Sequence, residues 1–159
     1  VSVTQRIDDS IVDEMTALDM CVEVAISERP ITCIRKRRTF KTEDNKKGYT
    51  VVSSKMYPQG DKEKYWFGYR DKRFEDIEDC DEQYMILGCR NKTLSVVRFP
   101  REFIEQNLGM LNTSVNSETG EISHYHIVIF KNPDGKMTML LSKPALREID
   151  ISDYVVGEI

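Results

Sequence analysis

Hydrophobic positions near the start of the chain recur at helical spacing. Within residues 8–26 they fall three or four positions apart, at Ile11, Met15, Leu18, Val22 and Ala25. Side chains at this spacing share one face of a helix, so the pattern predicts an amphipathic helix over 8–26. Ser10 is the predicted N-terminal cap, and Pro30 lies beyond the expected end of the helix.

After residue 30 the apolar and polar positions alternate in short runs, which is typical of strands with one buried face. The expected strands are 31–40, 49–56, 64–70, 83–89, 93–99, 123–130, 136–141 and 149–156. Asn132-Pro133-Asp134-Gly135 is turn chemistry and predicts a hairpin between 123–130 and 136–141. Pro100 suits the start of a short helix near 101–111. Residues 41–48, 71–82 and 112–121 are expected to be loops or connections. The prediction is an α+β fold with a mainly antiparallel sheet.

Length and composition narrow the class of protein. The chain has 159 residues, of which 40% are hydrophobic, so we expect one domain, with 1–28 as a helical segment and 31–159 as a sheet-rich body. It begins with valine, which suggests a piece of a longer protein. No apolar run approaches the roughly 18 residues of a membrane span. The four cysteines, Cys21, Cys33, Cys80 and Cys89, match no zinc motif. We therefore predict a cytoplasmic protein with reduced cysteines and no metal or cofactor.

Charge is segregated along the chain. Val1–Glu28 holds seven acids and one base, Arg35–Lys55 eight bases and two acids, and Asp71–Glu82 seven acids and two bases. Clustered cations attract phosphate backbones. The predicted phosphate contacts are Arg35, Lys36, Arg37, Arg38, Lys46 and Lys47. On a strand, Arg35 and Arg37 would face one way and Lys36 and Arg38 the other. The alternative for this run is an edge strand protected by charge.

A second candidate is the aromatic run Tyr65-Trp66-Phe67-Gly68-Tyr69-Arg70. On a strand, the two tyrosines share a face with Phe67, while Trp66 and Arg70 share the other with Lys64. A tryptophan between cations is a platform on which a nucleic-acid base can stack. The predicted binding residues here are Trp66, Tyr65 or Tyr69 beside it, and Arg70. The alternative is a strand buried on both faces.

Both histidines of the chain lie in His124-Tyr125-His126. On a strand they point to the same face, where two imidazoles can bind a metal ion or exchange protons. No nearby third ligand is evident. They define an alternative hypothesis, a small hydrolase or nuclease that uses His124 and His126.

Residues 49–154 resemble the accessory domains of bacterial restriction and defence proteins. The resemblance rests on Tyr65-Trp66-Phe67-Gly68-Tyr69, Leu87-Gly88-Cys89, Pro100 with its short helix, Leu111-Asn112-Thr113-Ser114 and His124–Phe130. Such domains recognise DNA and leave cleavage to another domain, so the resemblance implies DNA as the partner.

The leading hypothesis from the sequence is thus a DNA-binding module. A third hypothesis is a structural or interaction domain that forms a homodimer, or docks on a neighbouring domain, through the helix at 8–26.

Overall fold

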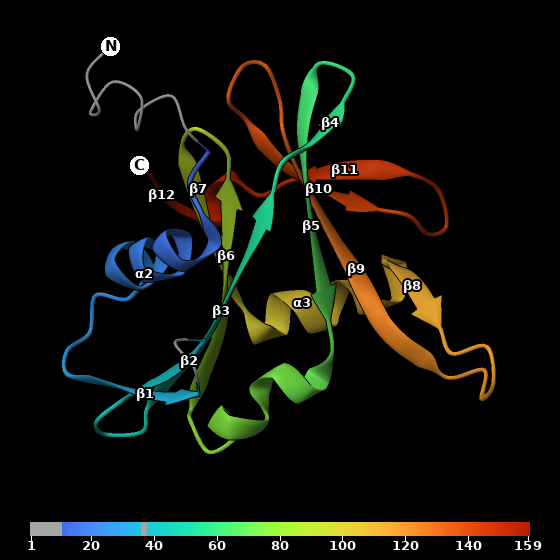
Figure 1. Ribbon diagram of the computed structural model, residues 1–159. Helices are drawn as coiled ribbons and strands as arrows, with labels where there is room; N and C mark the ends of the chain where they lie inside the picture. Colours follow the sequence, from blue (N-terminus) through green and yellow to red (C-terminus); the bar gives the residue numbers. More distant parts are fainter. Residues whose placement is uncertain (1–10, 36–37) are drawn as a thin grey trace, which may run out of the picture.

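The computed structural model describes residues 11–35 and 38–159. Two six-stranded sheets pack face to face, with one helix outside them and further helical segments at one end (Figure 1). The α+β class with mainly antiparallel strands and an N-terminal helix is confirmed. The helical elements are α2 (Glu14–Ala25), η1 (Asp71–Ile77), α3 (Arg101–Asn107), η2 (Leu108–Met110) and η3 (Ser152–Tyr154), where η marks a 3₁₀ helix.

Each sheet follows a simple order of neighbouring strands. The first sheet is β1 (Ile31–Arg35), β2 (Thr39–Thr42), β3 (Lys47–Lys55), β6 (Glu82–Arg90), β7 (Leu94–Pro100) and β12 (Val155–Glu158). The second is β11 (Arg147–Asp150), β10 (Met137–Leu141), β9 (Ile122–Lys131), β5 (Lys62–Tyr69) and β4 (Tyr57–Gln59), with β8 (Asn112–Val115) also beside β9. Only β3 and β6 run parallel among the pairs of the described chain.

The alternation of side chains along the first sheet creates two cores. On β3 and β6, Val52 and Leu87 face the second sheet and join the larger core. Val51 and Ile86 face outward and pack with α2 in a smaller core. Both faces of this sheet are therefore covered, whereas the outer face of the second sheet around Trp66 is open, with 36% of Trp66 exposed. That open face is where a ligand can approach.

The N-terminal helix differs from its prediction in start and orientation. Asp13, not Ser10, is the cap, and its carboxylate accepts a 2.9 Å hydrogen bond from the Thr16 backbone N–H. Residues 8–10 lie outside the described residues. The buried face consists of Ala17, Leu18, Cys21 and Ala25, while Met15 is exposed. Three of these four residues have small side chains, and all four pack against the first sheet.

The predicted strand over 31–40 is wrong, because the chain turns back within it. β1 and β2 form an antiparallel hairpin in which Arg35 pairs with Thr39. The expected alternation of side chains along one continuous strand therefore does not apply. Lys36 and Arg37 lie outside the described residues. Arg38 lies in the turn and continues into β2.

Two further segments contain strands that the sequence pattern did not separate. The predicted loop at 112–121 includes β8, which pairs with the start of β9. The predicted strand at 149–156 is instead β11 in one sheet and β12 in the other, linked by η3. The hairpins 83–99 and 123–141 form as predicted, in β6–β7 and β9–β10.

Candidate functional site

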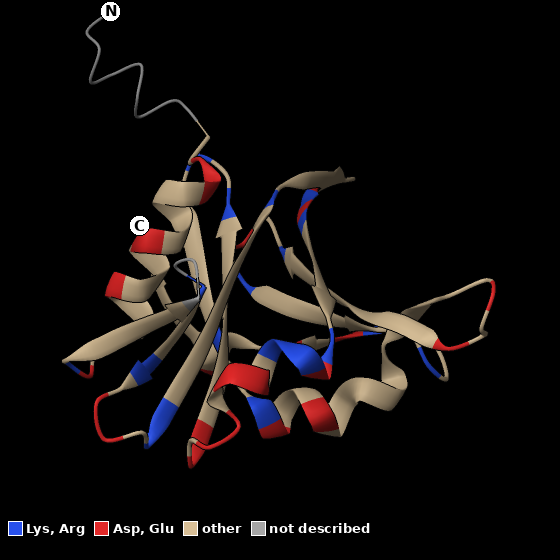
Figure 2. Cartoon of the chain, turned by 60° about the horizontal axis from the view of Figure 1, so that its bottom comes forward, with Lys and Arg blue, Asp and Glu red and all other residues tan. Residues whose placement is uncertain are grey.

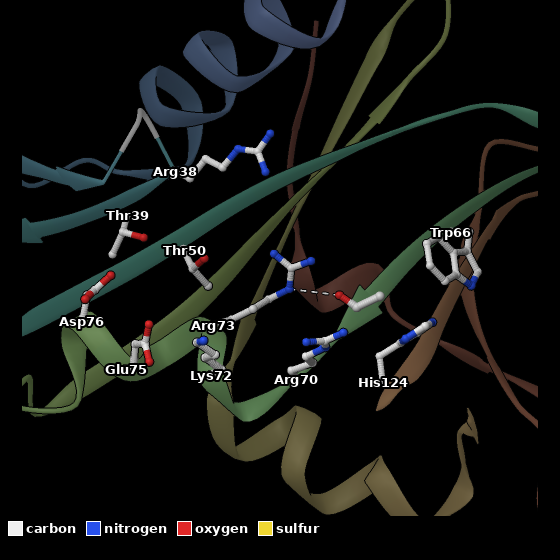
Figure 3. Close-up of a pocket in the computed structure, with 11 residues that line it drawn as sticks. Arg38, Thr39, Thr50, Trp66, Arg70, Lys72, Arg73, Glu75, Asp76 and His124 are labelled. Carbon is white, nitrogen blue, oxygen red and sulfur yellow. Dashed lines mark hydrogen bonds between the residues drawn. The ribbon is translucent and has the colours of Figure 1, made fainter. Parts of the chain in front are cut away.

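A cleft of about 440 Å³ opens where β2 and β3, η1 and the outer face of β5 meet (Figure 3). We call it the Trp66 cleft. Its lining residues are Arg38, Thr39, Thr50, Trp66, Gly68, Arg70, Lys72, Arg73, Glu75, Asp76 and His124. Cations outnumber acids along these walls, and an indole and an imidazole stand at one end. This composition suits an anion that carries a flat ring.

Arg73 stands in the middle of the cleft. Its Nε–H donates a 2.9 Å hydrogen bond to the Gly68 carbonyl, which leaves the terminal nitrogens of the guanidinium directed into the cleft (Figure 3). Burial, with Arg38 and Arg70 close by, lowers the pKa of Arg73 below its usual range. Within residues 11–35 and 38–159 no carboxylate pairs with Arg73. A half-buried cation beside two others is costly unless an anion joins it.

Arg38 and Arg70 complete what we call the arginine cluster (Arg38, Arg70 and Arg73). The backbone of Arg38 is held against β3, because its carbonyl accepts a 2.7 Å hydrogen bond from the Val51 N–H. Its side chain is 55% exposed and reaches Glu14 at 3.3 Å. Such an exposed pair is weak and exchanges readily with solvent or ligand. Arg70 lies between β5 and η1 and is exposed, so both side chains can turn toward an anion beside Arg73.

The other wall of the cleft is aromatic. The Trp66 ring lies nearly perpendicular to His124 and His126, with ring centroids 5.8 and 5.4 Å away. The two imidazoles are stacked at 5.2 Å. Gly68 lies under this group, and a Cβ added there would come within 3.2 Å of Trp66 Cη2. The indole and the imidazoles thus form an aromatic corner beside the arginine cluster, and the missing side chain of Gly68 leaves space next to it.

The cleft continues beyond Arg73 into a second cavity of about 300 Å³. The two cavities share Arg38, Trp66, Gly68 and Arg73. The second extends to Ser53, Lys55, Tyr57 and Arg90. Buried there, Ser53 Oγ and Arg90 Nε have no hydrogen-bond partner in the described part of the chain. A second set of donors therefore follows the first along one groove.

No family model, curated protein or solved structure matches this chain. The resemblance to restriction and defence domains thus stays a prediction. No helix among the described residues is long and apolar enough to cross a membrane.

The cleft brings together three of the nucleic-acid contacts proposed from the sequence, Arg38, Trp66 and Arg70, and it also includes His124 of the alternative hypothesis. Tyr65 and Tyr69 do not belong to it. They are 1% and 0% exposed and point into the larger core, as the alternation along β5 requires once Trp66 faces outward. Their proposed contact with a base is therefore corrected.

Lys46 and Lys47 line a different depression, beside Glu28. Lys47 donates a 2.8 Å hydrogen bond to Glu28, which also accepts one of 2.7 Å from the Tyr49 hydroxyl. The bond from Lys47 holds the pKa of Glu28 at about 2. Lys47 thus has a structural partner and is removed from the proposed phosphate contacts. Arg35 ends β1, three positions before the turn residue Arg38.

Sequence reasoning missed Lys72 and Arg73, the two bases of the acidic segment. Figure 2 shows basic and acidic stretches side by side on η1. The acids of that segment outnumber its two bases, so its net charge gave no indication of a cationic site. In the structure Glu75 and Asp76 line the opposite end of the cleft and have partners of their own. The usable signal was Lys72-Arg73 directly after the aromatic strand.

The structure offers less to the alternative hypotheses. Searched within the described residues, no group of three or more His, Cys, Asp or Glu side chains is placed to hold a metal ion, so His124 and His126 gain no third ligand. His126 instead shares a 2.7 Å hydrogen bond with Ser114 Oγ. Leu18 and Ala25 of the predicted stripe pack against the first sheet, whereas Ile11 and Met15 are exposed, so association through this helix stays a prediction.

We expect His126 to make stability depend on pH. Burial, and then the charges of His124 and Lys64, lower its pKa from the ordinary 6.5. The unfolded chain then binds more protons than the folded one, so the free energy of unfolding should fall as the pH drops through 6.5. Urea midpoints measured above and below this pH should differ less in His126→Gln than in the unaltered chain. Equal differences would contradict the assignment.

Proposed function

We propose that the chain is a nucleic-acid-binding module, with DNA as its partner, and that the Trp66 cleft is its contact surface. One observation carries the proposal: Arg73 is half-buried between Arg38 and Arg70 with no carboxylate partner in the described chain. Folding places these cations together at a cost, and a bound anion would offset that cost. Protein sites that violate rules of stability in this way are commonly functional sites.

The anion with the best chemical fit is a phosphodiester. A guanidinium presents its N–H groups in a planar fork that matches two oxygens of a phosphate, and several of them can share one backbone. The aromatic wall lies directly beside the arginine cluster, where the base attached to a bound phosphate would fall. A simple anion site would have no use for Trp66 and His124 in this position.

The biological setting of the proposal rests on the sequence. The resemblance noted above supports a recognition domain of a restriction or defence protein, acting in the cytoplasm. None of the four cysteines forms a disulfide within the described residues, which fits such a setting. In this view the chain supplies binding and a neighbouring domain supplies any cleavage.

The proposal predicts binding that weakens steeply with salt. Each neutralised phosphate contributes about −0.7 to −0.9 to the slope of log K against log salt, so three arginines give roughly −2 to −3. The slope can be measured by fluorescence anisotropy with a labelled oligonucleotide. Lys136→Gln is the control, because Lys136 lies beyond the far end of β9 and pairs with Asp150. Absence of binding, or a slope near zero, would overturn the proposal.

A further inference from the structure

The Trp66 cleft has the dimensions of a small-ligand site. At about 440 Å³, it falls in the range that encloses a single drug-sized molecule. In a duplex the bases are stacked inside and their faces are covered, so phosphate and base face cannot enter one small cavity together. An unstacked nucleotide presents both. The cleft offers partners for both, cations in the middle and aromatic rings at one end (Figure 3).

We infer that the cleft takes one unstacked nucleotide, its phosphate on the arginine cluster and its base against Trp66 and His124. This deepens the proposed function and rests on it. The ligand class becomes single-stranded nucleic acid, or a nucleotide extruded from a duplex, in preference to intact duplex.

Gly68 links the two halves of this site. Its carbonyl accepts the Nε–H of Arg73, which fixes the phosphate-binding guanidinium. Its Cα lies under the indole, where an added Cβ would approach Trp66 Cη2 to 3.2 Å. One backbone position therefore sets the spacing between cation and ring. A strand residue without a side chain often marks a place where a ligand approaches the backbone closely.

The second cavity supplies contacts for the neighbouring nucleotide. It shares Arg38, Arg73 and Trp66 with the first cavity, and Lys55 and Arg90 also line it. Lys55 lies over the Tyr57 ring at 5.2 Å, which adds a further aromatic surface. Alternating cations and rings along a groove is the pattern that holds single strands. The ligand is thus a segment of strand and not a free nucleotide alone.

Trp66 is the only tryptophan of the chain, so intrinsic fluorescence reports directly on the site. The probes are a short single-stranded oligonucleotide, its duplex, an abasic strand of equal charge, and free adenosine monophosphate. The single strand should quench Trp66 and bind roughly 5- to 100-fold tighter than the abasic strand, the range expected for base stacking. If adenosine monophosphate quenches Trp66 with the same affinity as the single strand, the cleft is still a nucleotide site, but its ligand is a free nucleotide.

Variants separate the base contact from the phosphate contact. Trp66→Leu, followed by anisotropy, should lose the same roughly 5- to 100-fold for the single strand and nothing for the abasic strand, whereas Trp66→Phe should keep most of the affinity. Duplex binding as tight as single-strand binding, with no effect of Trp66→Leu, would overturn the inference. The proposed function would survive that result if arginine variants still lost binding, and would fall with it if they did not.

Discussion

Replacing Arg38 and Arg73 together with glutamine should weaken nucleic-acid binding about 100-fold or more. A hydrogen bond to a charged group contributes about 1.5–3 kcal/mol, and about 1.4 kcal/mol is tenfold in affinity. Both residues line the part shared by the two cavities, so the double change removes the centre of the groove. The slope of log K against log salt should become shallower by about two. Anisotropy titrations at several salt concentrations measure both effects.

Controls for this experiment separate charge from geometry. Arg73→Lys keeps the charge and loses the planar fork, so we expect it to keep the salt slope and lose part of the affinity. Lys136→Gln removes one positive charge at an exposed site and should change neither. An unchanged affinity in the double variant, with the salt slope intact, would show that the arginine cluster does not contact phosphate.

Stability provides an independent test of the same residues. Arg73 is half-buried among cations, and within the described residues its guanidinium makes one hydrogen bond, to the Gly68 carbonyl. Removing it costs that bond, about 1.5–3 kcal/mol for a charged donor, and relieves repulsion from its neighbours. The fold of Arg73→Gln should therefore survive. Loss of binding in this variant would then reflect loss of the phosphate contact and not unfolding. A residue that function needs at some cost in stability is common in proteins.

The pattern of hydrophobic and polar residues predicted the features of the fold that depend on residues close together in sequence. The alternation in Tyr65, Trp66 and Phe67 correctly placed one face of β5 in the core, and the Pro133–Gly135 turn correctly joined β9 to β10. The hairpin at 31–42 was missed because the sequence from 35 to 38 is a run of bases without glycine or proline, which are the usual local signals of chain reversal.

The site itself was only partly predictable because it depends on contacts between distant elements. Arg38 and Trp66 meet because β2 pairs with β3, and the Trp66 N–H donates a 3.0 Å hydrogen bond to Ser54 Oγ at the end of β3. Arg73 joins them through the packing of η1 under the first sheet. The local signal at Arg73 is limited to its place, with Lys72, directly after the aromatic strand, and the acids of the same segment outweigh it in net charge.

The element that carries Arg73 is fixed by its next residue, Phe74. This ring is 0% exposed and lies in the larger core, 6.0 Å from the Tyr69 ring. The Arg101 guanidinium covers it, with Cζ 4.7 Å from the ring centroid. A short 3₁₀ helix has little stability of its own, so this burial holds η1 in place. The position of Arg73 in the cleft therefore depends on Phe74.

Phe74→Ala should lower the free energy of unfolding by about 3–5 kcal/mol, because it removes a buried ring and leaves a cavity. That is a large share of the 5–15 kcal/mol typical of a domain, and urea denaturation will measure it. Phe74→Leu, which keeps most of the volume, should cost less than about 1.5 kcal/mol and preserve binding. A loss below about 1 kcal/mol in the alanine variant would mean that η1 is held by other contacts. In that case the position of Arg73 would depend on its bond to Gly68, and the arginine cluster would form on a mobile segment.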